Sequence, residues 1–156
     1  MTKWGKVDFK QFKDFQKKLE KLDTMQQEFC EAAAKELAAR LLAKVIRRTP
    51  VGEYPAGSGM TGGTLRRGWT GNAKKGGASY AQSLPVKREG NNYVIDIINP
   101  TSYSSYVEYG HRTRGGGGWV QGRFMLTISV DEIQSAAPKI LEKKLAKWLG
   151  DMLNGK

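Results

Sequence analysis

DFKQFKDFQKKLEKLDTMQQEFCEAAAKELAARLLAKVIRR, residues 8–48, is the stretch that decides the fold of this chain. Apolar side chains recur through it at steps of three and four, at Phe9, Phe12, Phe15, Leu19, Leu22, Met25, Phe29, Leu37, Leu41 and Val45. That spacing places them on one face of an α-helix. Asp8 is suited to cap its N-terminus, and Pro50 ends it. Asp23-Thr24 is a second capping signal, so the stretch forms either one long helix or two consecutive ones.

A second helical pattern follows Pro138, which supplies a boundary. Apolar residues recur at helical spacing at Ile140, Leu141, Leu145, Trp148, Leu149, Met152 and Leu153, with lysines on the opposite side at Lys139, Lys143, Lys144 and Lys147. The pattern predicts an amphipathic helix over residues 138–153, packed on a sheet with its lysines in solvent. A helix lying on a membrane surface is the less favoured alternative. Residues 124–133 mix β-branched and helix-forming residues, and their state is ambiguous.

Loops and a small sheet occupy the region between the two helices. Two prolines and five glycines in residues 49–63 predict a surface loop. Residues 64–69 suit a short helical turn leading into a strand, and residues 70–79 form another loop. The tetrapeptide at residues 89–92, Glu-Gly-Asn-Asn, lies between apolar residues around Val86 and a strand-like run at residues 93–98, which predicts a β-hairpin.

The expected fold class is therefore α+β. We expect a single domain spanning residues 1–156, with a long N-terminal helix at 8–48, a small, mostly antiparallel sheet with long loops at 64–130, and a C-terminal helix at 138–153 packed on the sheet. Asp96 alone is charged in the second strand, so both faces of the sheet are expected to be covered, by helices or by a neighbouring subunit.

Composition restricts the environment and the partners. The sequence starts without a signal peptide and contains no membrane-length apolar run, and its single cysteine, Cys30, fits a reducing cytosol. The net charge is +11, which attracts nucleic acid, anionic lipid or an acidic protein surface. The basic residues are spread along the chain, whereas a dedicated nucleic-acid module more often concentrates them on one face.

Catalytic and cofactor motifs are missing from the sequence. Any triad has to use His111, and no nucleophile-elbow pattern surrounds a serine. One histidine, one cysteine and scattered carboxylates show no metal-ligand spacing. The glycine runs at 52–57 and 115–118 lack the Gly-Lys-Ser or Gly-Lys-Thr ending of a phosphate loop. We therefore expect neither an enzyme nor a catalytic, metal or cofactor site, and a small nuclease is the weakest alternative.

Aromatic residues gather instead between Tyr103 and Leu126, on both sides of Gly115–Gly118. Tyr, Trp and Arg are enriched at interface hot spots, so this segment suits docking. The candidate interface or loop-anchoring residues are Tyr103, Tyr106, Glu108, Tyr109, His111, Trp119, Arg123 and Phe124. The alternative, that they form the subunit's own core, is equally consistent with the sequence. Candidate contacts to DNA or to an acidic surface are Arg66, Arg67, Arg112 and Arg114.

Several short blocks in order carry a resemblance to a known family. They are Thr49-Pro50-Val51, Thr61-Gly62, Leu65-Arg66-Arg67-Gly68-Trp69, Asn99-Pro100, Tyr103 through His111, and Gly122-Arg123-Phe124-Met125-Leu126. In this order and spacing, the chain resembles the gene-product-ten family of minor tail components of tailed bacteriophages and prophages. It departs from the family in the residues inserted between Val51 and Thr61.

The resemblance implies a structural virion protein of the neck or tail, assembled in the host bacterial cytoplasm. Its implied role is head-to-tail joining or tail completion, as a subunit of a homo-oligomeric ring, with a hexamer favoured, around the DNA channel. The implied partners are the head–tail connector or stopper, the tail terminator and the tail-tube protein, together with non-specific contact to genomic DNA. The alternative is a stand-alone basic nucleic-acid-binding protein, motivated by the net charge.

Overall fold

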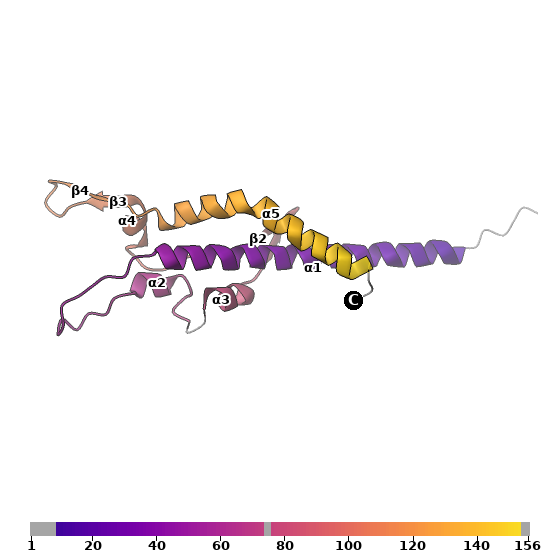
Figure 1. Ribbon diagram of the computed structural model, residues 1–156, viewed down its shortest axis with the longest axis horizontal. Coiled ribbons are helices and arrows are strands. Elements are labelled where there is room, and N and C mark those ends of the chain that lie inside the picture. The colour runs from indigo at the N-terminus through magenta and orange to yellow at the C-terminus, as the bar shows by residue number, and fades with distance from the viewer. Residues whose placement is uncertain (1–8, 74–75, 154–156) are drawn as a thin grey trace, which may run out of the picture.

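The computed structural model of the chain describes residues 9–73 and 76–153, and its long axis is the helix α1, Phe9–Arg48 (Figure 1). At 1.5 Å per residue, this 40-residue helix is about 60 Å long. The predicted helix is confirmed, and it is one helix rather than two. The predicted cap, Asp8, lies outside the described residues. At the other end, the amide of Thr49 still donates to the Val45 carbonyl at 2.9 Å before Pro50 ends the pattern.

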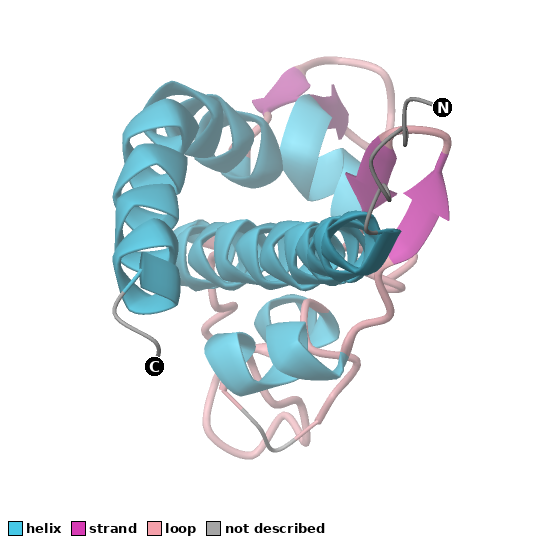
Figure 2. Cartoon of the chain, turned by 90° about the vertical axis from the view of Figure 1, so that its right-hand side faces the viewer, coloured by secondary structure: helices cyan, strands magenta, loops and turns pink. Residues whose placement is uncertain are grey.

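The C-terminal helix, α5, spans Met125–Leu153 and is almost twice as long as predicted. The prediction that Pro138 forms its boundary was wrong, because this proline lies inside the helix. A proline has no N–H and its ring crowds the preceding turn, so an interior proline bends a helix instead of always ending it. Figure 2 shows α5 as two limbs that run in different directions.

Helix α5 packs against α1 instead of on a sheet, contrary to the prediction. The Phe29 and Trp148 rings meet at a centroid distance of 5.2 Å. Two sets of ion pairs join the same helices: Glu132 binds Lys44 and Arg48, and Glu36 binds Lys144 at 3.0 Å. The two helices therefore form a long pair that sets the shape of the molecule (Figure 1).

In the sequence between α1 and α5, the chain forms only short elements. They are α2 (Thr64–Gly68), α3 (Gly77–Ser83), β1 (Lys87–Glu89), β2 (Asn92–Val94), α4 (Ser104–Tyr109), β3 (Gly110–Arg112) and β4 (Trp119–Gln121). The strands form two separate antiparallel hairpins, β1–β2 and β3–β4. The α+β class is confirmed, with a long N-terminal helix, small antiparallel hairpins and a C-terminal helix.

The first hairpin turns where predicted, with Gly90 at φ 62°. Its second strand ends at Val94 instead of Ile98. Helix α2 confirms the short helical turn, but the next element in the described part of the chain is the helix α3 instead of a strand. The loop predicted for residues 70–79 was wrong at residues 77–79, which belong to α3. The local sequence predicts this helix only weakly, and it is stabilised because Ala81 and Gly77 pack against α1.

The hydrophobic core is small and lies beside the C-terminal half of α1. Its buried members come from α1, α2, α3, α5 and the turn after α2: Ala38, Leu42, Val45, Leu65, Trp69, Ala81 and Met125. Half-buried Ile95 and Ile97 pack on it from the segment after β2. Within residues 9–73 and 76–153, no helix combines the length and apolar character needed to cross a bilayer.

A buried polar network ties α2 to the end of α1. The Trp69 Nε1–H donates to Thr49 Oγ1 at 2.7 Å, and this hydroxyl donates to the Val45 carbonyl at 2.7 Å. The Arg66 guanidinium donates twice to the Thr49 carbonyl. Since Thr49 and Trp69 are both buried, each polar group needs its partner here. The network explains why Thr49 and the block from Leu65 to Trp69 go together.

The segment after β2 is anchored to α2. The Asn99 side-chain amide donates to the Leu65 carbonyl at 2.8 Å. A Cβ at Gly68 would lie 2.3 Å from Asn99 Oδ1, so only glycine permits this close approach. The Thr49-Pro50, Leu65–Trp69 and Asn99-Pro100 blocks therefore meet in one place and hold α1, α2 and the 95–100 segment together.

Replacing Trp69 with Phe removes the indole donor to Thr49, and we expect the free energy of unfolding to fall by about 1–2 kcal/mol. In a Thr49→Val background the same replacement should cost less, with a coupling energy of about 1 kcal/mol. Urea denaturation of the four proteins measures both quantities. Strictly additive effects would show that the bond does not contribute.

The ion pairs between α1 and α5 predict a dependence of stability on pH. Arg40 and Lys144 hold the pKa of Glu36 below its ordinary value of 4.5, and Lys44 and Arg48 do the same for Glu132. A lowered carboxyl pKa stabilises the fold fully above the ordinary value, and this contribution disappears as the pH falls through the lowered value.

The double variant Glu36→Gln/Glu132→Gln should therefore melt below the wild type at pH 7, and the two melting temperatures should converge as the pH falls below about 4. Thermal unfolding followed by circular dichroism across this range tests it. The control is Glu142→Gln, at an exposed position on α5, and its melting temperature should match that of the wild type at every pH. A gap that persists at pH 2–3 would contradict the ion-pair origin.

Candidate assembly interface

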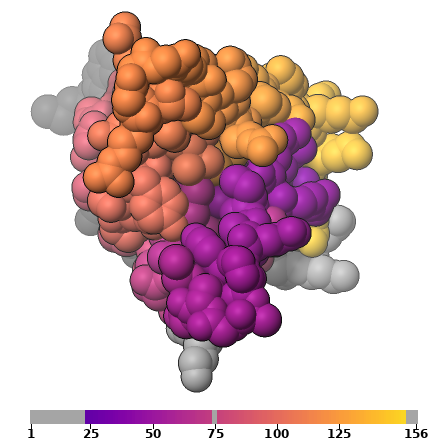
Figure 3. All heavy atoms as spheres, turned by 90° about the vertical axis from the view of Figure 1, so that its left-hand side faces the viewer, coloured from indigo at the N-terminus to yellow at the C-terminus, as the bar shows by residue number. Residues whose placement is uncertain are grey.

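One end of the molecule carries the aromatic segment identified in the sequence. Helix α4 and the β3–β4 hairpin lie at this end, next to the loop formed by residues 49–63 (Figure 3), and Tyr103 lines a cleft together with that loop. We call this surface the aromatic end, and define it by its exposed apolar side chains: Val51, Tyr54 and Met60 from the loop, Ile98 before α4, and Tyr103, Tyr106, Tyr109, Trp119 and Val120. The structure brings most of the predicted interface residues together here.

The aromatic side chains of this surface are open to solvent. Tyr109 is 61% exposed, and Tyr106 and Trp119 are each 58% exposed. His111 is half-buried, and its ring meets the Tyr106 ring edge-on at 5.7 Å. Large aromatic rings left in water forgo a considerable hydrophobic free energy, so such a group marks an interaction surface.

Two clefts flank α4 and connect these residues. A cleft of about 220 Å³ lies between Tyr103 and Val107 on one side and the loop at Val51 and Tyr54 on the other. A second cleft, of about 260 Å³, is lined by Ile98 and Tyr109 and has Trp69 and Met125 among its walls. A projecting side chain from a partner can enter such clefts, as anchor residues do at protein interfaces.

Glu108 differs from its neighbours because it is buried and points inward. Its carboxylate accepts hydrogen bonds from the Leu126 and Thr127 amides, each at 2.9 Å, and from the Thr127 hydroxyl at 2.8 Å. The first amides of a helix have no partner within the helix, and a local Ser, Thr, Asp or Asn usually binds them. Here a glutamate 18 residues earlier in the chain caps α5.

The backbone around Glu108 is joined to the start of α5 as well. The Arg123 amide donates to the Val107 carbonyl at 2.8 Å, and the Phe124 amide donates to the Glu108 carbonyl at 3.0 Å. Phe124 itself is half-buried at φ 48°, a left-handed conformation that is unusual for a non-glycine residue. Arg123 is exposed. The aromatic segment thus forms a closed loop, because hydrogen bonds join α4 to the residues just before α5.

Two glycines are required for this closure. A Cβ at Gly110, whose φ is +87°, would lie 2.4 Å from the Val120 carbonyl oxygen, and one at Gly122 would lie 2.4 Å from the Glu108 carbonyl oxygen. Both distances are well below a van der Waals contact. The four-glycine span at residues 115–118 closes the β3–β4 hairpin, where the Thr113 amide donates to the Gly118 carbonyl at 3.0 Å.

The four arginines proposed as DNA or acidic-surface contacts fall into two groups. Arg66 binds the Thr49 carbonyl, and Arg67 donates to the Gly62 carbonyl at 3.2 Å, so both support the fold locally. Arg112 and Arg114 are exposed near the tip of the β3–β4 hairpin. Arg67 is exposed as well, so Arg66 alone of the four is half-buried, and Arg112 and Arg114 are the two whose side chains make no hydrogen bond or ion pair among the described residues.

Sequence reasoning missed the contribution of the 49–63 loop to this surface. Val51, Tyr54 and Met60 are apolar residues within a loop rich in glycine and proline, and they are not packed in the core. An apolar side chain in such a loop has no helix or strand to bury it, which is a signal that points to a partner.

A reactive site is not apparent at the aromatic end. The Nδ1 atom of His111 lies 2.9 Å from the Arg112 carbonyl oxygen. In the part of the chain that the structure describes, no three His, Cys, Asp or Glu side chains gather closely enough to hold a metal ion. What the arrangement supports is recognition by shape and by aromatic contact.

The family relationship rests on residues 13–110, which match the model of the HK97-gp10-like family, described as "Bacteriophage HK97-gp10, putative tail-component". The chain belongs to this family. The protein is accordingly a structural tail component of a bacteriophage. No curated protein and no solved structure matches the chain. The match ends at Gly110, and the contacts of Glu108 join the matched region to α5 beyond it.

Replacement of Glu108 with Ala should lower the free energy of unfolding by about 2–4 kcal/mol, because it leaves three donors at the start of α5 without their charged acceptor. Glu108→Gln keeps one carbonyl oxygen as an acceptor, so its free energy of unfolding should lie between those of the wild type and the Ala variant. Chemical denaturation gives the values, and Glu142→Ala, an exposed glutamate on α5, should change stability by less than about 0.5 kcal/mol. An Ala variant as stable as the control would contradict the cap.

Proposed function

We propose that this tail component is a ring subunit that acts in head-to-tail joining or tail completion, around the channel through which the genome passes. The observation that carries the proposal is the aromatic end, where exposed tyrosines, Trp119 and apolar loop residues form one surface with two clefts. Interface hot spots have this composition, and virion subunits work by making such contacts.

The area of the isolated chain supports a partner-covered state. The chain exposes 12169 Å², whereas a compact monomer of this length exposes about 7800 Å². Among the described residues, two long helices and loops enclose only a small core, which contributes to this excess. A subunit of this kind gains most of its remaining apolar burial from neighbours, which is typical of proteins that function as assemblies.

The arrangement of exposed apolar groups suits a ring. Leu145 and Leu149 are more than 40% exposed on the second limb of α5, far along the molecule from the aromatic end (Figure 1). Contact between two different patches on successive copies is a heterologous interface, and repetition by rotation closes it into a ring. We favour a hexamer, as the family resemblance implies, with the connector or stopper, tail terminator and tail-tube proteins as neighbours.

The proposal predicts that Trp119→Ala/Arg123→Ala melts within about 2 °C of the wild type, because both side chains are exposed. The variant should fail to assemble when native mass spectrometry is recorded over a range of concentrations. Supplied in place of the normal protein during phage growth, it should leave heads and tails unjoined or incomplete in electron micrographs.

Trp119→Phe, which keeps an aromatic surface, is the matched control and should assemble. A loss of melting temperature in the double variant would show that these side chains hold the loop itself. Normal assembly and normal particles from the double variant would remove the aromatic end from the interface.

A further inference from the structure

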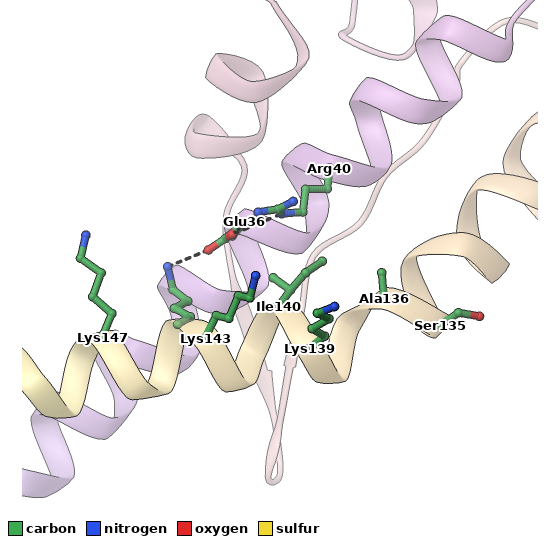
Figure 4. Close-up of a pocket in the computed structure, with 9 residues that line it drawn as sticks. Glu36, Arg40, Ser135, Ala136, Lys139, Ile140, Lys143 and Lys147 are labelled. Atoms are coloured by element: carbon green, nitrogen blue, oxygen red, sulfur yellow. Dashed lines mark hydrogen bonds and ion pairs between the residues drawn. The ribbon is translucent and has the colours of Figure 1, made fainter.

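A second surface lies away from the aromatic end, in the groove between α1 and the second limb of α5. The groove has a volume of about 610 Å³. Its walls are Glu36 and Arg40 from α1 and, from α5, Ser135, Ala136, Lys139, Ile140, Lys143, Lys144 and Lys147. Figure 4 shows the lysines arrayed along α5 opposite Glu36 and Arg40. We call this surface the lysine groove.

The charges in the lysine groove are unbalanced. Five cations line it and one carboxylate, Glu36, which is already shared between Arg40 at 2.8 Å and Lys144 at 3.0 Å. Among the described residues, Lys139, Lys143 and Lys147 make no ion pair. They follow one another at intervals of four residues, so their Cα atoms are about 6 Å apart along one face of the helix.

The ion pairs of the described residues do not account for this row of lysines. Like charges four residues apart on a helix repel and destabilise it. The favourable interaction of cations with the helix dipole is confined to the last turn, and α5 has no basic residue there. A row of cations that costs the isolated helix free energy is explained when a polyanion neutralises it.

The composition of the groove favours the phosphate backbone of DNA over an acidic protein. Lysine is depleted at the centre of protein interfaces, where aromatic residues and arginine are enriched. Lysine is a common partner of phosphate oxygens, which it binds as a point charge without reading sequence. The aromatic end therefore has the composition of a protein contact, and the lysine groove has that of a phosphate contact.

We propose that the lysine groove binds the phosphate backbone of duplex DNA, without sequence preference, through Lys139, Lys143 and Lys147. This inference rests on the proposed function in one respect: in a ring around the channel, the groove faces the passing genome. Binding itself is a property of the free protein. The lysine groove is distinct from the arginines of the β3–β4 hairpin, which lie at the aromatic end.

Two variants with the same net charge test the proposal. Lys143→Gln/Lys147→Gln removes two cations from the lysine groove, and Arg112→Gln/Arg114→Gln removes two from the hairpin tip. Lys144 is left unchanged because it binds Glu36. Fluorescence anisotropy with a labelled 30-base-pair duplex of arbitrary sequence, at 50 to 200 mM salt, gives the affinity and its dependence on salt.

For the groove variant we expect binding about tenfold weaker at 100 mM salt, and a log–log salt slope reduced by about 1.8, the value for two lost phosphate contacts. The hairpin variant should keep the wild-type slope. Equal losses in both variants would reduce the effect to net charge and overturn the proposal. A loss in the hairpin variant alone, or no binding by the wild type, overturns it as well.

A membrane surface is distinguished by a parallel titration with vesicles of phosphatidylserine and phosphatidylcholine. Tighter, lysine-dependent binding to these vesicles than to the duplex would overturn the assignment to DNA. Native mass spectrometry separates this proposal from the ring: the groove variant should assemble as the wild type does. Normal DNA binding by a protein that forms no ring would refute the proposed function and leave the lysine groove as a DNA site.

Discussion

The Glu108 carboxylate holds together the parts of this protein that the long helices do not. The side chain extends from α4 to the start of α5, where its carboxylate accepts hydrogen bonds from two backbone amides and one hydroxyl. Because this carboxylate is buried, the three donors are its compensation for the loss of water. The cap fixes where α5 begins, and it also fixes where α4 stands relative to the helix pair.

The position of the aromatic end depends on that cap. Amides at residues 123 and 124 pair with carbonyls of α4, and Gly110 and Gly122 allow the backbones to approach within the reach of these bonds. The backbone that carries the exposed aromatic rings is therefore held rigidly. A rigid base lowers the entropy lost on association, which suits a surface that has to dock repeatedly with the same neighbours.

The two proposed surfaces lie on different parts of this tail component. Aromatic and apolar side chains cluster around α4, while unpaired lysines line the groove between α1 and α5. A contact made through the aromatic end does not use the cations of the lysine groove. A positive groove that binds phosphate only as a point charge also allows DNA to move past it, since every position along the duplex presents the same backbone.

The sequence by itself determined the helical state of the N-terminal stretch, the turn of the first hairpin, the general class and the family, because these depend on local periodicity, on turn residues and on short blocks in order. It left open whether that stretch is one helix or two. Tertiary structure alone decided the rest. The start of α5 depends on a cap 18 residues away, Pro138 is held within a helix by packing on α1, and α3 forms because Ala81 is buried there. Likewise, the lysine groove needs two helices distant in sequence to lie together, since a row of lysines on one helix looks like an ordinary solvated face until its opposite wall is present.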